Sequence, residues 1–409
     1  MVESEGASVT ISATVAGGSM GRGRSRLNRL VRLAGAAAMA AALAACAQTV
    51  PRPTPITQAP TVSGAPTRPD DGVLRVGMLL PLSGGSAALG EAMQRAAQMA
   101  VFDTGTQVEL LPRDTGDSPN AAGQAAQSVI AQGADIILGP LFSKSVGPVA
   151  QQARAAGINV VAFSTDTAQA GGNVFLLSFL PQQAIDRIVG YGASQGMRRF
   201  ALLAPRSAYG QIVSRALSEA AVKYNVEAPV VELYDSKLSD PTELQQKLQA
   251  TQVDAVIVAD VGSRLSVVAP MLGYSGITAK LMGTGQWDDP QVNRQPYLAG
   301  AWYAAPDPSR RADFESRYAQ QFGGPPPRLA TLAYDAVALT ASLAGQPSSG
   351  SNPFNTVALQ DPNGFVGIDG IFRFGQNGLV QRGLAVLQAE PSGPTVVESA
   401  PDSFSGAAF

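Results

Sequence analysis

Short apolar runs alternate with helix-like segments from about residue 73 onward. Residues 73–80 (VLRVGMLL) are almost uniformly apolar, which is typical of a strand buried on both faces. Residues 81–85 interrupt this run, and residues 87–102 are expected to form a helix. Strand–helix alternation of this kind predicts a parallel sheet with helices on both faces. The next expected elements are strands at 108–111, 136–138 and 159–162, and helices at 120–132 and 146–156.

The same alternation starts again near residue 200. It predicts strands at 200–204, 229–234, 255–259 and 280–283, and helices at 211–224, 241–250 and 264–272. We therefore expect two α/β halves of similar size, with the changeover at 179–199. A helix at 329–343 follows, and then β structure in which residues 376–378 turn a hairpin between 370–374 and 384–388. Two such sheets side by side would place the carboxyl ends of both sets of strands around one crevice, where ligands bind.

The N-terminal part has a different pattern. Five arginines between residues 22 and 32 precede an uncharged apolar run at 33–45, which ends in Leu43-Ala44-Ala45-Cys46. A basic region, an apolar region and small residues form a secretory signal, and the run is shorter than the about 20 residues that span a bilayer. We expect residues 1–45 to be this signal, with Met20 as the true start.

Prolines are then spaced through residues 46–72, which we expect to form a semi-extended tether. At about 3.1 Å per residue, such a tether would hold the rest of the chain at a distance from its anchor. Residues 391–409 are expected to be frayed.

Composition excludes several kinds of chemistry. The 409 residues include no histidine and one cysteine, so Ser-His-Asp triads, His-ligated metals, thiolate zinc sites and iron–sulfur clusters are impossible. No lysine follows a serine at the spacing of a Ser-x-x-Lys nucleophile. We therefore expect no metal and no cofactor. The net charge of −2 does not favour nucleic-acid binding. An enzyme that uses carboxylates alone stays open, with Asp260, Asp288 and Asp289 as its candidates.

Several short motifs are informative through their order and spacing along the chain. They are residues 76–84 (VGMLLPLSG), Leu138-Gly139-Pro140, Tyr209-Gly210, Tyr334-Asp335-Ala336, and 365–374 with its spaced glycines. Together they resemble the leucine/isoleucine/valine-binding family of type 1 periplasmic binding proteins. The resemblance covers residues 73–390 and implies a two-lobed α/β fold, with two doubly wound parallel sheets and a ligand cleft between them. Lobe 1 would comprise about 73–181 plus 328–357, and lobe 2 about 182–327 plus 358–390.

The resemblance also implies a binding site. In that family serine hydroxyls and backbone N–H groups of the first lobe hold the carboxylate of an amino acid, and a tyrosine closes over it from the second lobe. The corresponding residues here are Ser143, Ser164, Thr165 and Tyr209, with Asp166 nearby. Each has a structural alternative, because Ser143 could cap a helix, Ser164 and Thr165 could satisfy a turn, and Tyr209 could serve packing.

The second lobe departs from the family pattern. Gly285 stands where an acidic residue would pair with the ligand ammonium, Val261 where an aromatic residue is expected, and Leu89 at a further aromatic position. A buried ammonium without a carboxylate is costly. Asp260, Asp288 or Asp289 would then substitute from a neighbouring position, and we include Asp260 among the ligand-binding residues; the alternative is that all three are solvated loop residues.

The expected function is that of a non-catalytic periplasmic ligand-binding lipoprotein. Its ligand would be a small polar molecule such as an amino acid, and its partner an ABC permease. Leu43–Cys46 resembles the lipobox of bacterial lipoproteins, which implies a lipid on Cys46, and Ala47 in place of aspartate favours the outer membrane. The alternative is a penicillin-binding protein activator, a lipoprotein regulator of peptidoglycan synthesis whose amino-acid site has degenerated.

Overall fold

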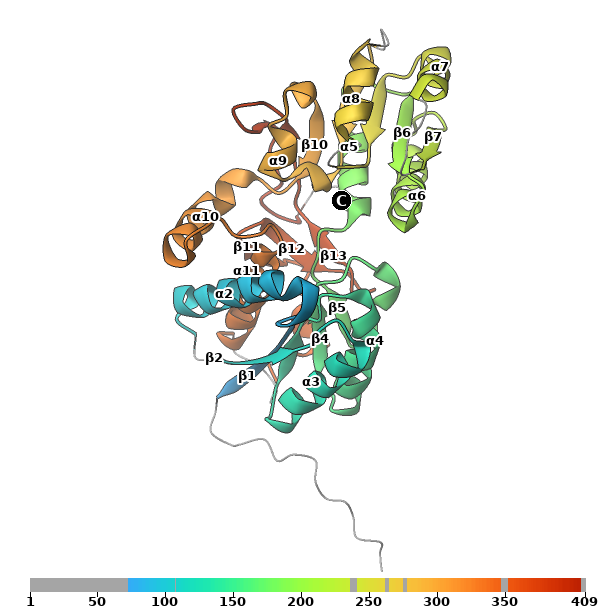
Figure 1. Ribbon diagram of the computed structural model, residues 1–409. Coiled ribbons are helices and arrows are strands. Elements are labelled where there is room, and N and C mark those ends of the chain that lie inside the picture. The colour runs from blue at the N-terminus through green and yellow to red at the C-terminus, as the bar shows by residue number, and fades with distance from the viewer. Residues whose placement is uncertain are drawn as a thin grey trace, which may run out of the picture. The chain divides into compact units, whose positions relative to one another are not determined.

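The first set of apolar runs forms a five-stranded parallel sheet in the computed structural model, which describes residues 73–106, 108–235, 241–261, 265–274, 278–346 and 352–405. The strand order is β2-β1-β3-β4-β5, and every neighbouring pair is parallel. The strands are β1 (Leu74–Leu80), β2 (Val108–Asp114), β3 (Ile136–Leu138), β4 (Asn159–Ala162) and β5 (Val174–Leu176). We call this sheet and the elements packed on it lobe 1 (Figure 1).

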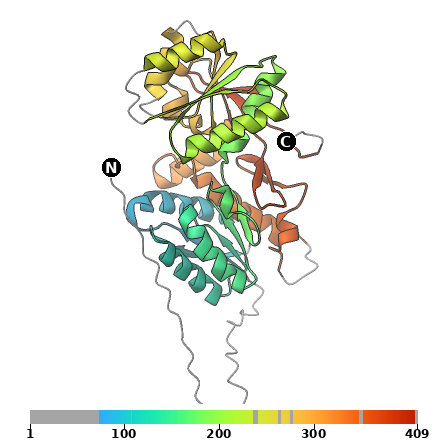
Figure 2. The same cartoon turned by 90° about the vertical axis from the view of Figure 1, so that its right-hand side faces the viewer.

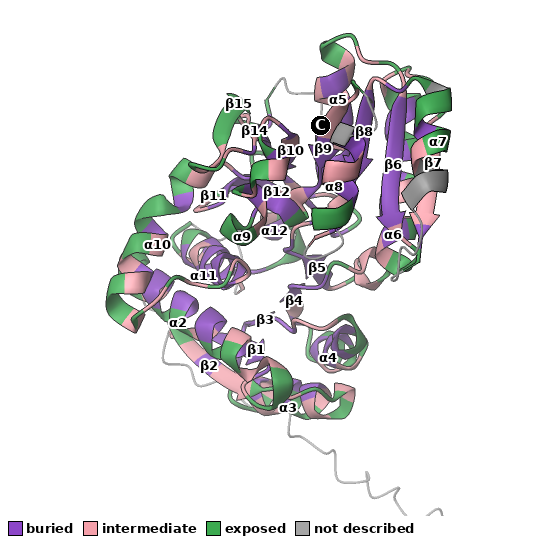
Figure 3. Ribbon diagram, turned by 45° about the horizontal axis from the view of Figure 1, so that its top comes forward, coloured by how far each residue is buried: buried purple, intermediate pink, exposed green. Residues whose placement is uncertain are grey.

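Both faces of this sheet are covered, because successive side chains of a strand point to opposite sides. Met78 of β1 belongs to one apolar cluster, with α2 and α11, whereas Leu79 belongs to another, with α3 and α4. Figure 3 shows α11 largely buried between its neighbours. The helices are α2 (Ala87–Thr104), α3 (Pro119–Ala131), α4 (Ser143–Ala155) and α11 (Ala330–Ala344).

The second set of runs forms a seven-stranded sheet, which we call lobe 2. Its order is β15-β14-β10-β9-β8-β6-β7, parallel from β7 to β10 and antiparallel at β14 and β15. The strands are β6 (Phe200–Pro205), β7 (Val230–Tyr234), β8 (Ala255–Val258), β9 (Lys280–Gly283), β10 (Trp302–Ala305), β14 (Ala385–Gln388) and β15 (Thr395–Glu398). The expected fold class, with two wound α/β sheets, is confirmed.

Helices cover both faces of the second sheet as well (Figure 2). Leu202 of β6 belongs to a cluster with α5 and α6, and Leu203 to a cluster with α7 and α8. The helices are α5 (Pro181–Ser194), α6 (Ala208–Lys223), α7 (Pro241–Thr251) and α8 (Leu265–Tyr274), with the short α9 (Pro290–Asn293) beyond them. The expected changeover at 179–199 therefore contains a helix, α5, that the sequence reading did not identify.

The boundaries expected for the lobes need correction. Helix α10 (Pro308–Phe322) follows β10 of lobe 2, yet its Phe314 and Tyr318 belong to the core of lobe 1. Arg317 of this helix pairs with Asp103 of α2 at 2.8 Å. Sequence order suggested that residues up to 327 belong to lobe 2, but the aromatic face of α10 is buried against α2.

A small antiparallel sheet, β11-β12-β13, also packs on lobe 1. Its strands are β11 (Phe365–Gly367), β12 (Gly370–Phe374) and β13 (Val380–Arg382), and the short α12 (Thr356–Leu359) precedes them. The turn at Asn377-Gly378 thus joins β12 to β13 and not to 384–388, because β14 pairs with β10 in the other sheet. The expected hairpin partner was wrong, and so was the assignment of 358–390 as a whole to lobe 2.

The expectation of a frayed C-terminal tail is also wrong within the described residues. Strand β15 pairs antiparallel with β14, and Phe404 is buried. The signal at 1–45, Cys46 and the tether at 46–72 lie outside the described residues. Within the described part of the chain, no helix has the length and apolar character needed to cross a membrane.

Candidate functional site

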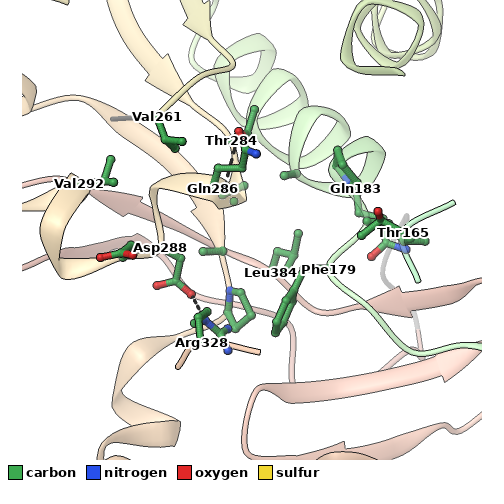
Figure 4. Close-up of a pocket in the computed structure, with 18 of the residues that line it drawn as sticks. Thr165, Phe179, Gln183, Val261, Thr284, Gln286, Asp288, Val292, Arg328 and Leu384 are labelled. Carbon is green, nitrogen blue, oxygen red and sulfur yellow. Dashed lines mark hydrogen bonds and ion pairs between the residues drawn. The ribbon is translucent and has the colours of Figure 1, made fainter. Parts of the chain in front are cut away.

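A cavity of about 820 Å³ lies at the carboxyl ends of three adjacent strands of lobe 2. Val261 comes three residues after β8, Thr284 directly after β9, and Pro306 directly after β10. The loop between β5 and α5 and the segment before α11 supply the opposite wall. Figure 4 shows these side chains converging from separate elements. Apolar side chains make up much of the lining: Phe179, Leu180, Val261, Leu265, Val292, Leu329 and Leu384.

Tyr209 enters the cavity from the first turn of α6. The helix begins here because Ser207 is its N-cap, with Ser207 Oγ accepting from the N–H of Gly210 at 3.2 Å. Tyr209 Oη lies 2.9 Å from Thr284 Oγ1, and either hydroxyl can donate. Burial raises the pKa of Tyr209 to about 12, so its phenol is neutral at physiological pH. It can therefore serve a ligand as a hydrogen-bonding group but not as a charge.

A turn of 3₁₀ helix, η3 (Gly285–Trp287), forms the wall between β9 and α9. Trp287 is fully buried behind it and donates from Nε1 to the carbonyl oxygen of Asp260 at 3.0 Å. A Cβ on Gly283 would overlap the Trp287 ring, so glycine is required at the end of β9. The Trp287 ring packs directly on Gly283, and the next two residues, Thr284 and Gly285, line the cavity.

Buried ion pairs form the floor of the cavity. The Oδ1 of Asp288 accepts from Arg311 at 2.6 Å, and its Oδ2 accepts from Arg328 at 2.7 Å. Arg328 also binds Asp369 through two hydrogen bonds, of 2.8 and 3.1 Å. We call Arg311, Asp288, Arg328 and Asp369 the Arg–Asp chain. It connects lobe 2, through Asp288, to α10 and to the segments around α11, which pack on lobe 1.

A second charged pair, Arg382 and Asp335, lies beside this chain. Arg382 Nε donates to the carbonyl oxygen of Ser178 at 3.1 Å, while its Nη1 is 3.5 Å from Asp335 Oδ2. Both side chains are almost fully buried. Burial, and then the charge of Asp369, raise the pKa of Asp335 to about 7, and burial lowers the pKa of Arg382.

The Phe179 ring contacts both arginines that face the cavity. Its centroid is 4.2 Å from the guanidinium carbon of Arg328 and 4.9 Å from that of Arg382. Cation–π contacts of this kind stabilise partly desolvated guanidinium groups. Phe179 therefore lies where the charged floor meets the apolar wall, and Figure 4 shows Phe179 and Arg328 on the same side of the cavity.

Two of the six ligand-binding residues proposed from sequence line this cavity: Thr165 and Tyr209. The structure places the other four outside the lining. Ser143 is exposed at the first position of α4, where Phe142 occupies the N-cap, so it is not a capping residue either. Ser164 Oγ accepts from the N–H of Asp166 at 3.1 Å, as expected from the alternative in which it satisfies a turn.

The remaining two acidic candidates also have structural partners. Asp166 caps a short 3₁₀ turn by accepting from the N–H of Ala168 at 3.2 Å. Asp260 is buried, and it accepts from Tyr234 Oη at 2.6 Å and from the N–H of Val261 at 2.8 Å. Neither lies among the residues that line the cavity.

The two positions that depart from the family pattern in lobe 2 do line it. Gly285 and Val261 both face the cavity, and neither supplies a charge or an aromatic ring. Leu89 instead packs against the core of lobe 1. Sequence reasoning missed Phe179, Arg328 and Arg382, because no local pattern distinguishes them from ordinary loop and strand residues.

The described residues contain no group of three or more side chains that could ligate a metal ion. The arrangement is thus an apolar cavity with a charged floor and a few hydroxyl and amide groups. Such a composition suits the binding of a small organic molecule.

Comparison with known proteins gives one family match and two curated relatives. The profile of the family described as periplasmic binding protein matches residues 73–394. An uncharacterised protein of Rickettsia prowazekii is 23% identical over 186 residues, which are 45% of this chain and 49% of the relative. Penicillin-binding protein activator LpoA of Glaesserella parasuis is 28% identical over 145 residues, 35% of this chain and 24% of the relative. The chain therefore spans about half the length of the first relative and about a quarter of the second.

Solved structures share the fold. A candidate branched-chain amino acid ABC transporter protein of Rhodospirillum rubrum has a TM-score of 0.73 at 18% identity, over 80% of this chain and all of that one. The substrate-binding protein LivJ of Streptococcus pneumoniae, in complex with isoleucine, has a TM-score of 0.56 at 18% identity, over 80% of this chain and 99% of that one. A solute-binding protein of R. palustris, in complex with benzoate, has a TM-score of 0.56 at 18% identity, over 81% and 97%.

Proposed function

Because this chain belongs to the periplasmic binding protein family, we propose that it is a non-catalytic binding protein that takes up one small organic ligand and delivers it to an ABC permease. The cavity at the carboxyl ends of β8, β9 and β10 carries this proposal, since open α/β sheets bind ligands at that edge. Its volume of about 820 Å³ is typical of small-molecule sites. The chain resembles the substrate-binding proteins of branched-chain amino acid ABC transporters, so amino acids and related solutes are the first ligands to test.

The alternative of a carboxylate-only enzyme receives no support from the three aspartates that it needs. Asp260 accepts two hydrogen bonds within lobe 2, and Asp288 is paired with Arg311 and Arg328. Asp289 is exposed and caps α9 by accepting from the N–H of Gln291 at 2.7 Å. Each carboxylate thus has a structural role, which supports the non-catalytic proposal.

Among the residues proposed from sequence, we retain Thr165 and Tyr209 as ligand contacts, one from lobe 1 and one from lobe 2. Ser143, Ser164 and Asp166 lie around the carboxyl ends of β3 and β4 in lobe 1, outside the cavity lining. Asp260 supports the wall from behind, because its carbonyl oxygen holds Trp287.

A thermal-shift screen of the purified full chain tests the proposal. A ligand that binds the folded state alone adds about 2.7 kcal/mol of stability at 100 times its dissociation constant. We expect at least one amino acid or related organic acid to raise the melting temperature at millimolar concentration. No shift with any member of such a set would overturn the proposal.

The second candidate function is activation of a penicillin-binding protein. The match to LpoA supports it, although it covers 24% of that relative, so the activity of the whole relative is not carried over. The test is capture of purified penicillin-binding proteins by the chain, followed by a transpeptidation assay. Binding together with faster cross-linking would favour this candidate, and neither effect would remove it.

The location that we propose is the periplasm, in keeping with the family, with a lipid on Cys46 as the anchor to the outer membrane. Cys46→Ala is then expected to move the protein from the membrane fraction to the soluble fraction, or to leave it unprocessed. Retention of a processed Cys46→Ala protein in the outer-membrane fraction would contradict the lipid anchor.

A further inference from the structure

The charged groups that line the cavity differ in how fully they are paired. Among the described residues they are Asp288, Asp289, Arg328 and Arg382. Asp288 accepts from two arginines, and Arg328 uses Nε, Nη1 and Nη2 in bonds to Asp288, Thr331 and Asp369. Every guanidinium nitrogen of Arg328 and both carboxylate oxygens of Asp288 therefore already have a partner.

Arg382 is different. It is 4% exposed, and among the described residues neither its Nη1 nor its Nη2 has a hydrogen-bond partner. The nearest carboxylate oxygen, Asp335 Oδ2, is 3.5 Å from Nη1 and has no hydrogen-bond partner there either. Buried donors on a charged group are costly to leave unbonded. A guanidinium group with two unbonded nitrogens beside a cavity therefore favours an anion as the ligand, and its planar geometry fits the two oxygens of a carboxylate.

Within the part of the chain that the structure describes, the cavity offers nothing comparable to a cation. Gly285 occupies the place of the acidic residue that the family resemblance calls for, and Asp288 is committed to Arg311 and Arg328. Asp289 is the other lining carboxylate, and it is exposed at the rim, where it caps α9. A ligand ammonium would lose its hydration here and would find only this solvent-exposed carboxylate in return.

The remaining walls favour an apolar ligand body. Val261, Leu265 and Val292 line the lobe 2 side, and Phe179, whose ring centroid is 4.9 Å from the guanidinium carbon of Arg382, lines the opposite wall. Solved structures of this fold hold an amino acid in one case and benzoate in another, so the fold alone does not decide whether the ligand carries an ammonium group. The side chains of this cavity must decide it.

We propose that the cavity binds an apolar organic carboxylate without an ammonium group, and that Arg382 on β13 binds the carboxylate. This rests on the proposed binding function and specifies its ligand class. The ligand anion accepts from Nη1 and Nη2 of Arg382, and its apolar part lies against the lobe 2 wall. The two nitrogens are buried and Phe179 lies 4.9 Å from the guanidinium carbon, so the ligand reaches them only when the Phe179 ring moves aside.

Isothermal titration of the full chain with three matched probes tests the ligand class. 4-Methylpentanoate, L-leucine and 4-methylpentanamide share a branched body; leucine adds the ammonium group, and the amide removes the charge. We expect the acid to bind at least about tenfold more tightly than either of the others, since hydrogen bonds between two charged groups are stronger than those to a neutral amide. Benzoate and benzamide repeat the comparison with an aromatic body.

Variants test the role of Arg382. Arg382→Gln alone leaves Asp335 without its counterion, so the double variant Arg382→Gln/Asp335→Asn, which removes both charges, is the working comparison. We expect it to fold and to bind 4-methylpentanoate and 4-methylpentanamide equally. Arg113→Gln, a change on the outer side of lobe 1 where Arg113 bonds to Ser128, is the matched control and retains the preference for the acid.

The outcomes separate the inference from the function on which it rests. Leucine binding as tightly as the acid, or more tightly, would overturn the ligand class and leave the binding function intact. An undiminished preference for the acid in the double variant would overturn the role of Arg382. Absence of binding by these probes and by the wider solute screen would overturn both.

Discussion

Asp288→Asn tests how much the buried ion pairs of the cavity floor contribute to the free energy of unfolding. The Asp288 side chain is 3% exposed and accepts from Arg311 at 2.6 Å and from Arg328 at 2.7 Å. Breaking a buried ion pair by removing one partner costs about 3–5 kcal/mol, because the other charge stays buried. Each arginine keeps one further partner, Glu315 for Arg311 and Asp369 for Arg328, so we expect the lower end of this range, about 3 kcal/mol.

Urea unfolding followed by circular dichroism measures this change as a lower midpoint at an unchanged slope. Asp289→Asn is the matched control, since it makes the same chemical change at the next residue. Asp289 is exposed and caps α9, and asparagine caps as well as aspartate does, so we expect no more than about 0.5 kcal/mol. A loss below about 1 kcal/mol for Asp288→Asn, or equal losses for the two variants, would refute the reasoning.

Three further predictions concern single residues around the cavity. Burial raises the pKa of Asp335 to about 7, so between about pH 4 and 7 the folded protein keeps a proton that the unfolded chain has released. The free energy of unfolding should therefore fall as pH rises from about 4 to 7. Melting curves across this range should show a smaller pH dependence for Asp335→Asn. Gly283→Ala places a methyl group against the Trp287 ring, so we expect the free energy of unfolding in urea to fall by about 1–3 kcal/mol and ligand binding in titration to weaken. The control is Gly324→Ala, whose added Cβ meets no atom within 4 Å and which should change neither quantity. Tyr209→Phe removes the hydroxyl that lies 2.9 Å from Thr284 Oγ1, which should cost about 1 kcal/mol in urea unfolding; an unchanged midpoint would show that this hydrogen bond does not stabilise the fold.

Local sequence pattern was sufficient to predict most of the sheet architecture. Buried parallel strands are short and largely apolar, so β1 and β8 could be placed within a residue or two of their observed bounds. The pattern failed where chain order and spatial order differ. Helix α10 follows a lobe 2 strand but buries Phe314 and Tyr318 in lobe 1, and no local signal shows on which lobe an amphipathic helix packs.

The tail illustrates the same limit in a different way. Residues 391–409 are rich in small and polar side chains, which is why we expected them to be frayed. All four residues of strand β15 are exposed, so its sequence shows no alternation of apolar and polar residues that would predict a strand. Its order comes from the edge of β14, which offers backbone hydrogen bonds to any extended segment.

The binding site shows most clearly what a sequence pattern cannot supply. Arg382 bonds to the carbonyl oxygen of Ser178, which is 204 positions earlier in the chain, and the Phe179 ring lies against Arg328 as well as Arg382. From the motifs alone, glycine in place of the acidic residue at 285 looks like the loss of an amino-acid site, and this favoured the regulator alternative. With Arg382 beside the same cavity, the replacement agrees with the ligand class that we propose, since the described lining holds a partner for an anion and Gly285 supplies none for a cation. The missing carboxylate at Gly285 therefore does not count against a binding function.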